Sequence, residues 1–134
     1  MLIDWSDDYL IGIDMIDKQH QEFFARVHRL YESCLASEGE KDVQEMLDFL
    51  KNYAIEHFQA EEAFMKQHRY PGVEEHSKLH ATFLDEYSKL SEEYRNLGSN
   101  QDLADNITDM VQNWLIDHIA EADRDYARHA KKNT

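Results

Sequence analysis

Five histidines are spaced so that they could hold a metal ion inside a helical protein. His76 and His80 are four residues apart, so they lie about 40° from each other on one helix face. His20, His57 and His118 each fall within an apolar stripe of helical period. A buried imidazole has two nitrogens that need partners, and an apolar core offers few. A shared metal would satisfy one nitrogen of every ring, so the pattern predicts a metal site.

Two carboxylates could complete such a site. Glu61 follows His57 by four residues and shares its helix face. Glu62 points about 100° away from Glu61 and is expected to be solvated. Asp123 follows His118 by five residues, which on a straight helix places it about 140° away. Spacing alone therefore favours a solvent-exposed Asp123, unless the helix ends, loosens or bulges between these two residues.

The remaining three histidines do not follow this pattern. His28 lies about 80° from His20, at the edge of the apolar stripe. His68 precedes the Tyr70-Pro71 break, and His129 lies in a polar stretch near the end of the chain. We expect these three at the surface or at helix boundaries.

The elements that position the cluster are predicted to be helices. One proline and four glycines in 134 residues leave few breaks, and most apolar residues recur at helical period. The expected helices cover about residues 17–36, 41–66, 73–97 and 101–122. Breaks are expected near residues 37–39, at 70–72 and at 98. Long helices with short links favour an all-α fold, an antiparallel up-down-up-down four-helix bundle forming one domain over residues 1–134.

Residues 1–16 are expected to form an extended N-terminal arm that packs against the bundle, and the residues after 122 a short polar tail. Gly12 indicates a tight bend in the arm. The apolar residues that would hold the arm in place are Trp5, Tyr9, Ile11, Ile13 and Ile16.

The composition limits the partners and the compartment. Asp and Glu number 28 against 14 Lys and Arg, and the net charge of −14 disfavours nucleic acid and anionic lipid as partners. We expect no signal peptide and no membrane span, because the sequence has neither a basic segment followed by an apolar run nor a long apolar stretch. Cys34 is the single cysteine, which excludes an intramolecular disulfide and makes the cytoplasm the expected location.

Four stretches of the chain resemble the signatures of the hemerythrin family, in order and with its spacing. They are IGIDMIDKQH (11–20), HFQAEEAFM (57–65), YPGVEEHSKLH (70–80) and WLIDHIAEAD (114–123). The resemblance implies a non-haem centre of two iron ions (Fe²⁺/Fe³⁺) with an oxo or hydroxo bridge. It also implies that Asp123 is a metal ligand, in place of the solvent-exposed Asp123 that spacing alone favours. The resemblance implies that His76, His80 and His118 bind one iron and that His20 and His57 bind the other. It implies that Glu61 and Asp123 bridge the two.

The resemblance further implies reversible binding of O₂ at the iron with two histidines, which keeps an open position. Nitrogen and carboxylate ligands suit iron, although they leave manganese and zinc open, and the lack of a cysteine ligand argues against an iron–sulfur cluster. Tyr126 is a candidate for a hydrogen bond near the ligands. The candidates for the wall of the O₂ pocket are Phe23, Phe24, Phe58, Trp114 and Leu115.

Carriage, storage or sensing of O₂, for a separate O₂-consuming protein, is the leading function, and this function is not enzymatic. Azide and nitric oxide are further possible ligands. Compared with carboxylate-rich di-iron bundles, this ligand set is rich in neutral ligands, and we expect the smaller number of anionic donors to favour reversible O₂ binding over oxygenation. The alternatives are a di-iron enzyme or scavenger acting on peroxide, nitric oxide or free iron, and a purely structural acidic bundle.

Overall fold

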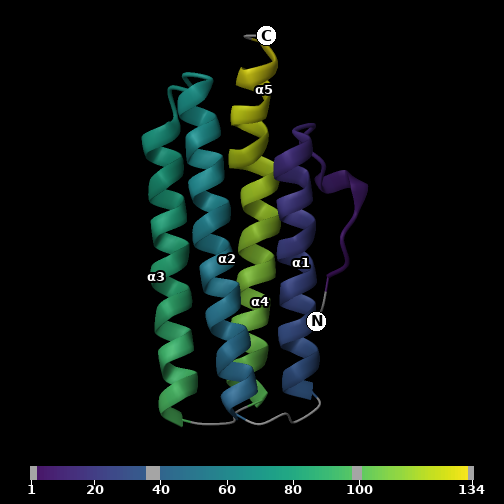
Figure 1. The fold of residues 1–134 in the computed structure, drawn as a ribbon, viewed down its shortest axis with the longest axis vertical. Helices are drawn as coiled ribbons and strands as arrows, with labels where there is room; N and C mark the ends of the chain where they lie inside the picture. The colour runs from purple at the N-terminus through teal and green to yellow at the C-terminus, as the bar shows by residue number, and fades with distance from the viewer. Residues whose placement is uncertain (1–2, 36–39, 98–100, 133–134) are drawn as a thin grey trace.

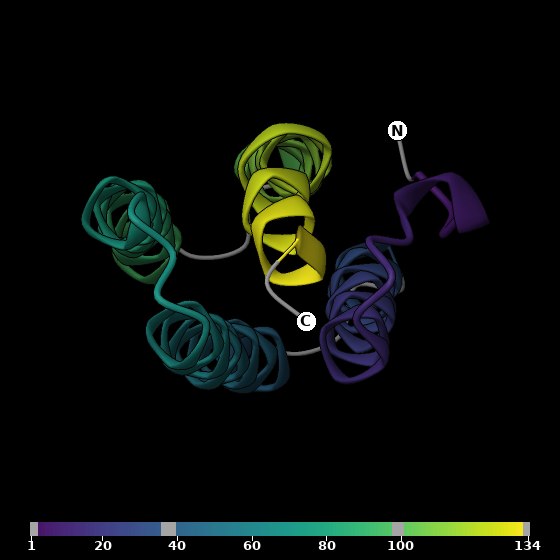
Figure 2. The same cartoon turned by 90° about the horizontal axis from the view of Figure 1, so that it is seen from above.

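Four long helices form the body of the protein in a computed structural model that describes residues 3–35, 40–97 and 101–132 (Figure 1). They are α1 (Asp14–Leu35), α2 (Glu40–Gln67), α3 (Val73–Leu97) and α4 (Gln101–His118), and consecutive helices run in opposite directions. Seen along the bundle axis, α1 and α3 each pack on both α2 and α4 (Figure 2). The predicted all-α antiparallel four-helix bundle is therefore confirmed.

The first helix starts earlier than the sequence predicts, at Asp14 rather than at Asp17. The Asp17 N–H donates to the carbonyl of Ile13 at 2.8 Å, which adds a turn before the expected start. The second helix begins and ends one residue beyond its predicted limits, and the third has the predicted limits. The breaks expected near residues 37–39 and at Gly98, and the side chain of Cys34, lie outside the described residues.

The break predicted at residues 70–72 separates α2 from α3. Arg69 adopts a left-handed φ of 54°, and the Tyr70 N–H donates to the carbonyl of Met65 at 2.9 Å. This is the hydrogen bond that closes a helix end of the Schellman type. The tight reversal places the C-terminal turns of α2 beside the first turns of α3, where the predicted ligands lie.

The fourth helix continues beyond its predicted end. A π-helical turn, η2 (Ile119–Asp123), follows α4 and leads into α5 (Arg124–Lys132), which extends the same column (Figure 1). The residues expected to form a polar tail are thus helical up to Lys132. The reason is that Tyr126, Ala127 and Ala130 recur at helical period and are buried.

The N-terminal segment lies against α1, as expected, and includes a short 3-10 turn, η1 (Asp7–Tyr9) (Figure 2). The ring of Phe24 on α1 lies 5.4 Å from that of Trp5 and 5.5 Å from that of Tyr9. Gly12 has a φ of 87°, which confirms the predicted bend. The buried Asp17 carboxylate accepts the N–H of Gly12 at 3.1 Å, which fixes the segment one turn before the first histidine ligand candidate.

The core is built from apolar side chains of every helix, including Phe23, Leu50, Phe83 and Val111. In the part of the chain that the structure describes, no helix combines the length and apolar character needed to cross a membrane.

Candidate metal centre

All seven predicted ligands meet inside the bundle, toward the end where α2 turns into α3. None of them is more than 6% exposed. Each helix of the bundle contributes: His20 comes from α1, His57 and Glu61 from α2, His76 and His80 from α3, His118 from the end of α4 and Asp123 from η2.

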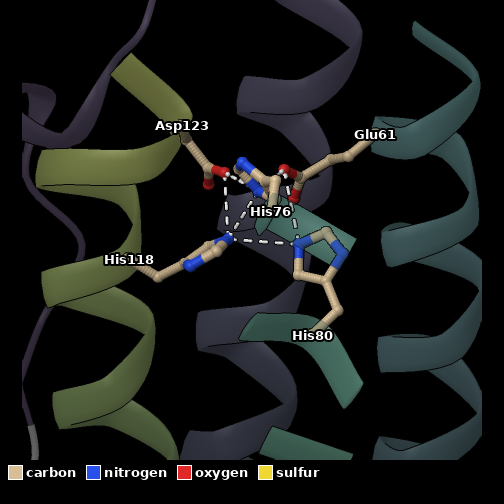
Figure 3. A group of neighbouring side chains, drawn as sticks. All are labelled: Glu61, His76, His80, His118 and Asp123. Carbon is tan, nitrogen blue, oxygen red and sulfur yellow. Dashed lines mark hydrogen bonds and ion pairs between the residues drawn. The ribbon is translucent and has the colours of Figure 1, made fainter. Parts of the chain in front are cut away.

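Three of the histidines direct their Nε2 atoms toward one another (Figure 3). The Nε2 of His118 lies 2.8 Å from that of His76 and 3.1 Å from that of His80. A single proton can join two of these nitrogens, but it cannot satisfy all three. Two nitrogens bound to one ion at right angles, with bonds of about 2.1 Å, lie about 3 Å apart. The spacing of the three nitrogens is therefore that of ligands around one cation.

The Asp123 carboxylate lies between this group and His20. Its Oδ1 is 3.1 Å from the Nε2 of His76 and 3.2 Å from that of His118. Its Oδ2 is 3.1 Å from the Nε2 of His20. One oxygen thus faces the three-histidine group and the other faces α1.

Glu61 divides its oxygens in the same way. Its Oε1 contacts the Nε2 of His57 and lies 3.5 Å from that of His20. Its Oε2 lies 3.5 Å from the Nε2 of His76 and 4.0 Å from that of His80. Glu61 therefore belongs to two sets of possible metal ligands, one with His20 and His57 and one with the three histidines and Asp123.

Many polar atoms of the cluster lack an aligned hydrogen-bond partner within the described ranges. Those that face the interior of the cluster include Nε2 of His20 and of His57 and both carboxylate oxygens of Glu61 and Asp123. The others are Nδ1 of His20, His76 and His80 and the hydroxyl of Tyr126. Buried polar atoms without partners are rare and costly in folded proteins. A cation bound among them would satisfy the Nε2 atoms and the carboxylate oxygens together, so the donor set fits a metal.

The electrostatics of the protein without metal also indicate that positive charge belongs in this cluster. Burial alone lowers the pKa of His20 and of His76, but contacts with Asp123 and Glu61 outweigh it and raise each pKa to about 9. Burial acts to raise the pKa of both carboxyls, yet the neighbouring histidines hold each pKa below its usual range. Without metal, protons on the histidines supply the charge that the carboxylates attract.

The pKa of His80, the third histidine of the group with His76 and His118, shifts in the opposite direction. Burial, together with repulsion from His118 and His76, lowers the pKa of His80 to about 3. Its ring is therefore neutral at pH 7, and a neutral imidazole is the form that binds metal.

The prediction from spacing alone, a solvent-exposed Asp123, is wrong. Asp123 is fully buried, because the chain between it and His118 forms the π-helical turn η2. The alternative stated with that prediction, a bulge before Asp123, is the one that occurs.

Aromatic rings surround the histidines. Phe58 stacks on His80 with ring centroids 3.9 Å apart, and Trp114 stacks on His118 at 4.3 Å. Phe23 meets His57 edge-on at 6.0 Å. Three of the predicted wall residues, Phe23, Phe58 and Trp114, therefore contact the cluster.

The remaining candidates, Leu115 and Phe24 for the pocket wall and Tyr126 for a hydrogen bond, lie in different surroundings. Leu115 is 1% exposed and precedes His118 by three residues on α4. Tyr126, the candidate for a hydrogen bond near the ligands, is buried with its ring 5.4 Å from that of His76, but its hydroxyl has no aligned hydrogen-bond partner among the described residues. Burial and the nearby carboxylates raise the pKa of this hydroxyl. Phe24 packs with Trp5 beside a surface hollow of about 340 Å³, so its position belongs to the packing of the N-terminal segment.

Two neighbours of the ligand candidates were missed by sequence reasoning. The Oε1 of Gln19 lies 2.8 Å from the Nδ1 of His57. Glu62, expected to be solvated, has a side chain only 25% exposed, with its Oε1 3.8 Å from the Nδ1 of His80. Each is adjacent in sequence to a predicted ligand, and this adjacency was the only available signal.

The three histidines assigned to surface or boundary positions lie apart from the cluster. The Nε2 of His28 is 2.8 Å from the carbonyl oxygen of Ile3. The Nε2 of His129 is 3.0 Å from the carbonyl oxygen of His68. All three rings are half-buried and take part in packing near the chain ends.

Comparison with known proteins agrees with this geometry. The profile of the family described as "Hemerythrin HHE cation binding domain" matches residues 11–130. A bacteriohemerythrin from Stenotrophomonas maltophilia (strain R551-3) is 33% identical over 97% of this chain and 82% of its own length. A myohemerythrin from Riftia pachyptila is 27% identical over 91% of this chain and 88% of its own.

A crystal structure of a hemerythrin mutant superposes with a TM-score of 0.83 at 24% identity, covering 96% of this chain and 97% of that one. This similarity supports the fold. The match of the family profile to most of the chain shows that the protein belongs to the hemerythrin family, as the resemblance of its motifs predicted.

Proposed function

We propose that this protein binds O₂ reversibly at a non-haem di-iron centre. In this proposal three histidines bind one iron and two bind the other, and the two carboxylates bridge the pair. His76, His80 and His118 would hold the first iron, His20 and His57 would hold the second, and Glu61 and Asp123 would bind both.

The observation that carries the proposal is that the two oxygens of each buried carboxylate point toward different histidine groups. Glu61 and Asp123 come from different helices, yet each turns one oxygen toward the three-histidine group and the other toward His20. A single metal ion would need only one oxygen from each. Two carboxylates that each reach both histidine groups suit a pair of bridged ions.

The unequal number of histidines supports the location of the O₂ site. The iron with His20 and His57 would have one protein ligand fewer than its neighbour and would keep a position open. When bound, the iron pair would supply the electrons needed to hold O₂ and recover them when O₂ leaves.

The protein's own residues would provide a dry and rigid setting for this exchange. Phe23, Phe58 and Trp114 pack against the histidine rings and would exclude water from the centre. The neutral histidine ligands would also disfavour oxygenation, since they donate less charge than the carboxylates of other di-iron bundles. For this reason we propose carriage, storage or sensing of O₂ rather than an enzymatic reaction. The location we propose is cytoplasmic, in keeping with the single cysteine.

Loading the protein with Fe²⁺ under argon tests this function directly. We expect two iron ions per chain and an ultraviolet–visible spectrum that changes on exposure to O₂ and returns when O₂ is removed. A crystal structure of the loaded protein should contain two ions about 3.5–4 Å apart.

A single ion per chain, or an O₂ response that never reverses, would contradict the proposal. Consumption of hydrogen peroxide or nitric oxide much faster than the iron oxidises in air would instead establish the enzymatic alternative. Azide binding to the oxidised protein, followed by its absorption band, checks that a position on the iron pair is open.

A further inference from the structure

The ring of His57 has its two nitrogens in different surroundings. Its Nε2 faces the cluster and contacts Glu61, and its Nδ1 faces away and lies 2.8 Å from the Oε1 of Gln19. Gln19 is on α1, so the contact crosses from one helix to the next.

An amide oxygen can only accept a hydrogen bond, so the Nδ1 of His57 must be the donor. This arrangement puts the ring proton on Nδ1 and leaves the lone pair on Nε2. If the amide group were turned over, its N–H₂ would need the lone pair of Nδ1, and the proton would sit on Nε2. That second tautomer could not bind a metal through Nε2.

Gln19 is itself held in place by α2. The hydroxyl of Tyr53, one turn before His57, donates to the backbone carbonyl of Gln19 at 3.0 Å. The guanidinium of Arg26 lies 4.5 Å from the centre of the Tyr53 ring, and the Phe23 ring packs edge-on against both Tyr53 and His57. Two hydrogen bonds between the same two helices therefore restrict where the Gln19 side chain and the His57 ring can lie.

We infer that Gln19 is a positioning residue, which holds His57 with its proton on Nδ1 and presents its Nε2 to the metal. The inference rests on the proposed metal centre. Because the Gln19 amide is neutral, it fixes the ring without adding negative charge behind it. Partners of this kind on the outer nitrogen of a ligand histidine fix its orientation and typically change metal affinity about 10- to 100-fold when removed.

Three variants separate positioning from general packing. Gln19→Leu removes the acceptor at similar size, and Gln19→Glu keeps an acceptor but makes it anionic. Gln21→Leu is the matched control, since Gln21 is an exposed glutamine two residues further along the same helix. Circular dichroism spectra and melting curves first establish that all three are folded.

The first measurements use Zn²⁺, which is diamagnetic, on the full-length protein. Chelator competition should show about 10- to 100-fold weaker Zn²⁺ binding for Gln19→Leu. The NMR signal of the His57 Nδ1–H should be present and slowly exchanging in the wild type and Gln21→Leu, and exchange faster in Gln19→Leu. Equal Zn²⁺ affinity of Gln19→Leu and Gln21→Leu, or no proton on the Nδ1 of His57 in the wild type, would overturn the inference.

The iron-loaded protein gives a second readout that packing alone would not change. Gln19→Glu should keep its iron but have a lower reduction potential than the wild type, because the anionic acceptor makes His57 a stronger donor. An unchanged potential would overturn the inference even if Gln19→Leu failed to fold. If Gln19→Leu binds Zn²⁺ more weakly but the iron-loaded wild type does not bind O₂ reversibly, only the proposed function is rejected. If the wild type binds no metal, both the proposed function and this inference are rejected.

Discussion

Asp123 places its Oδ1 3.2 Å from the Nε2 of His118, although the two residues are five positions apart on one helical column. On a straight α-helix their side chains would point about 140° apart. The π-helical turn η2 inserts one extra residue per turn and brings Asp123 round to the side of His118. The bulge thus returns the carboxylate to the bundle interior.

Changing Asp123 to Asn should remove metal from the protein. An amide offers only one oxygen with a lone pair for the metal, whereas the proposed bridge needs an oxygen for each ion. We expect Asp123→Asn to bind fewer than two ions per chain, measured by plasma mass spectrometry. Asp117→Asn, an exposed residue of α4, should load as the wild type does. Full loading of Asp123→Asn would show that the carboxylate does not bridge.

The two adjacent glutamates of α2 should differ in the same assay. Glu61 is fully buried with both oxygens in the cluster, while the Glu62 carboxylate reaches only to 3.8 Å from the outer nitrogen of His80. Glu61→Ala should lose most of its iron, and Glu62→Ala should keep it, as a colorimetric iron assay would show. Equal iron content in the two variants would contradict the assignment of Glu61.

Removing the metal should make stability depend on pH in the alkaline range. In the folded protein without metal, His20 and His76 keep their protons up to about pH 9, whereas in the unfolded chain they lose them near pH 6.5. The folded state then holds more protons between these pH values, so its stabilisation by these two groups is complete below pH 6.5 and lost as the pH rises to 9.

Melting temperatures of the metal-free and the Zn²⁺-loaded protein, measured from pH 6.5 to 9, test this expectation. The metal-free protein should melt at progressively lower temperature. The loaded protein should not show this decrease, since its histidine nitrogens hold metal instead of protons. Parallel curves for the two forms would mean that the histidines do not titrate as described.

Enlarging the pocket at Leu115 should speed the loss of the reduced iron form. Leu115→Ala leaves a cavity one turn before His118, which would admit water and small anions to the centre. We expect faster autoxidation and tighter azide binding, with a stability loss of about 2–5 kcal/mol. Leu47→Ala is the control, because Leu47 is equally buried but lies ten residues before His57 on α2. Identical autoxidation rates in the two variants would show that Leu115 serves the core alone.

Asp17 should stabilise the attachment of the N-terminal segment independently of metal. Its carboxylate accepts the N–H groups of Ile11 at 2.8 Å and Gly12 at 3.1 Å. Asp17→Ala would leave both without a partner, and we expect it to lower the free energy of unfolding of the metal-free protein by about 2–4 kcal/mol in urea titrations. Asp14→Ala, at an exposed position of the same helix, should change it little. Similar losses in the two variants would contradict the role given to Asp17.

The bundle and most of the ligand set could be predicted from the sequence, because helical period is a local property of the chain. Residues three and four apart share a face whatever the helix later packs against. The four-residue intervals from His57 to Glu61 and from His76 to His80 therefore identified the metal-binding faces of α2 and α3. The apolar stripes around His20 and His118 identified the buried faces of α1 and α4 in the same way.

The tertiary structure decided the features that depend on how the helices are rotated and where their regular period breaks. Periodicity alone could not turn Asp123 inward, since a regular helical period predicts neither the π-helical turn η2 nor the helix α5 that follows it. Nor could it direct Gln19 to the outer nitrogen of His57, because that contact joins two helices whose relative rotation is set by the whole core. The sequence by itself determined which residues could bind metal, through spacing within each helix. Only the packed bundle decided which atoms of different helices face one another, because those distances depend on contacts between residues far apart in the chain.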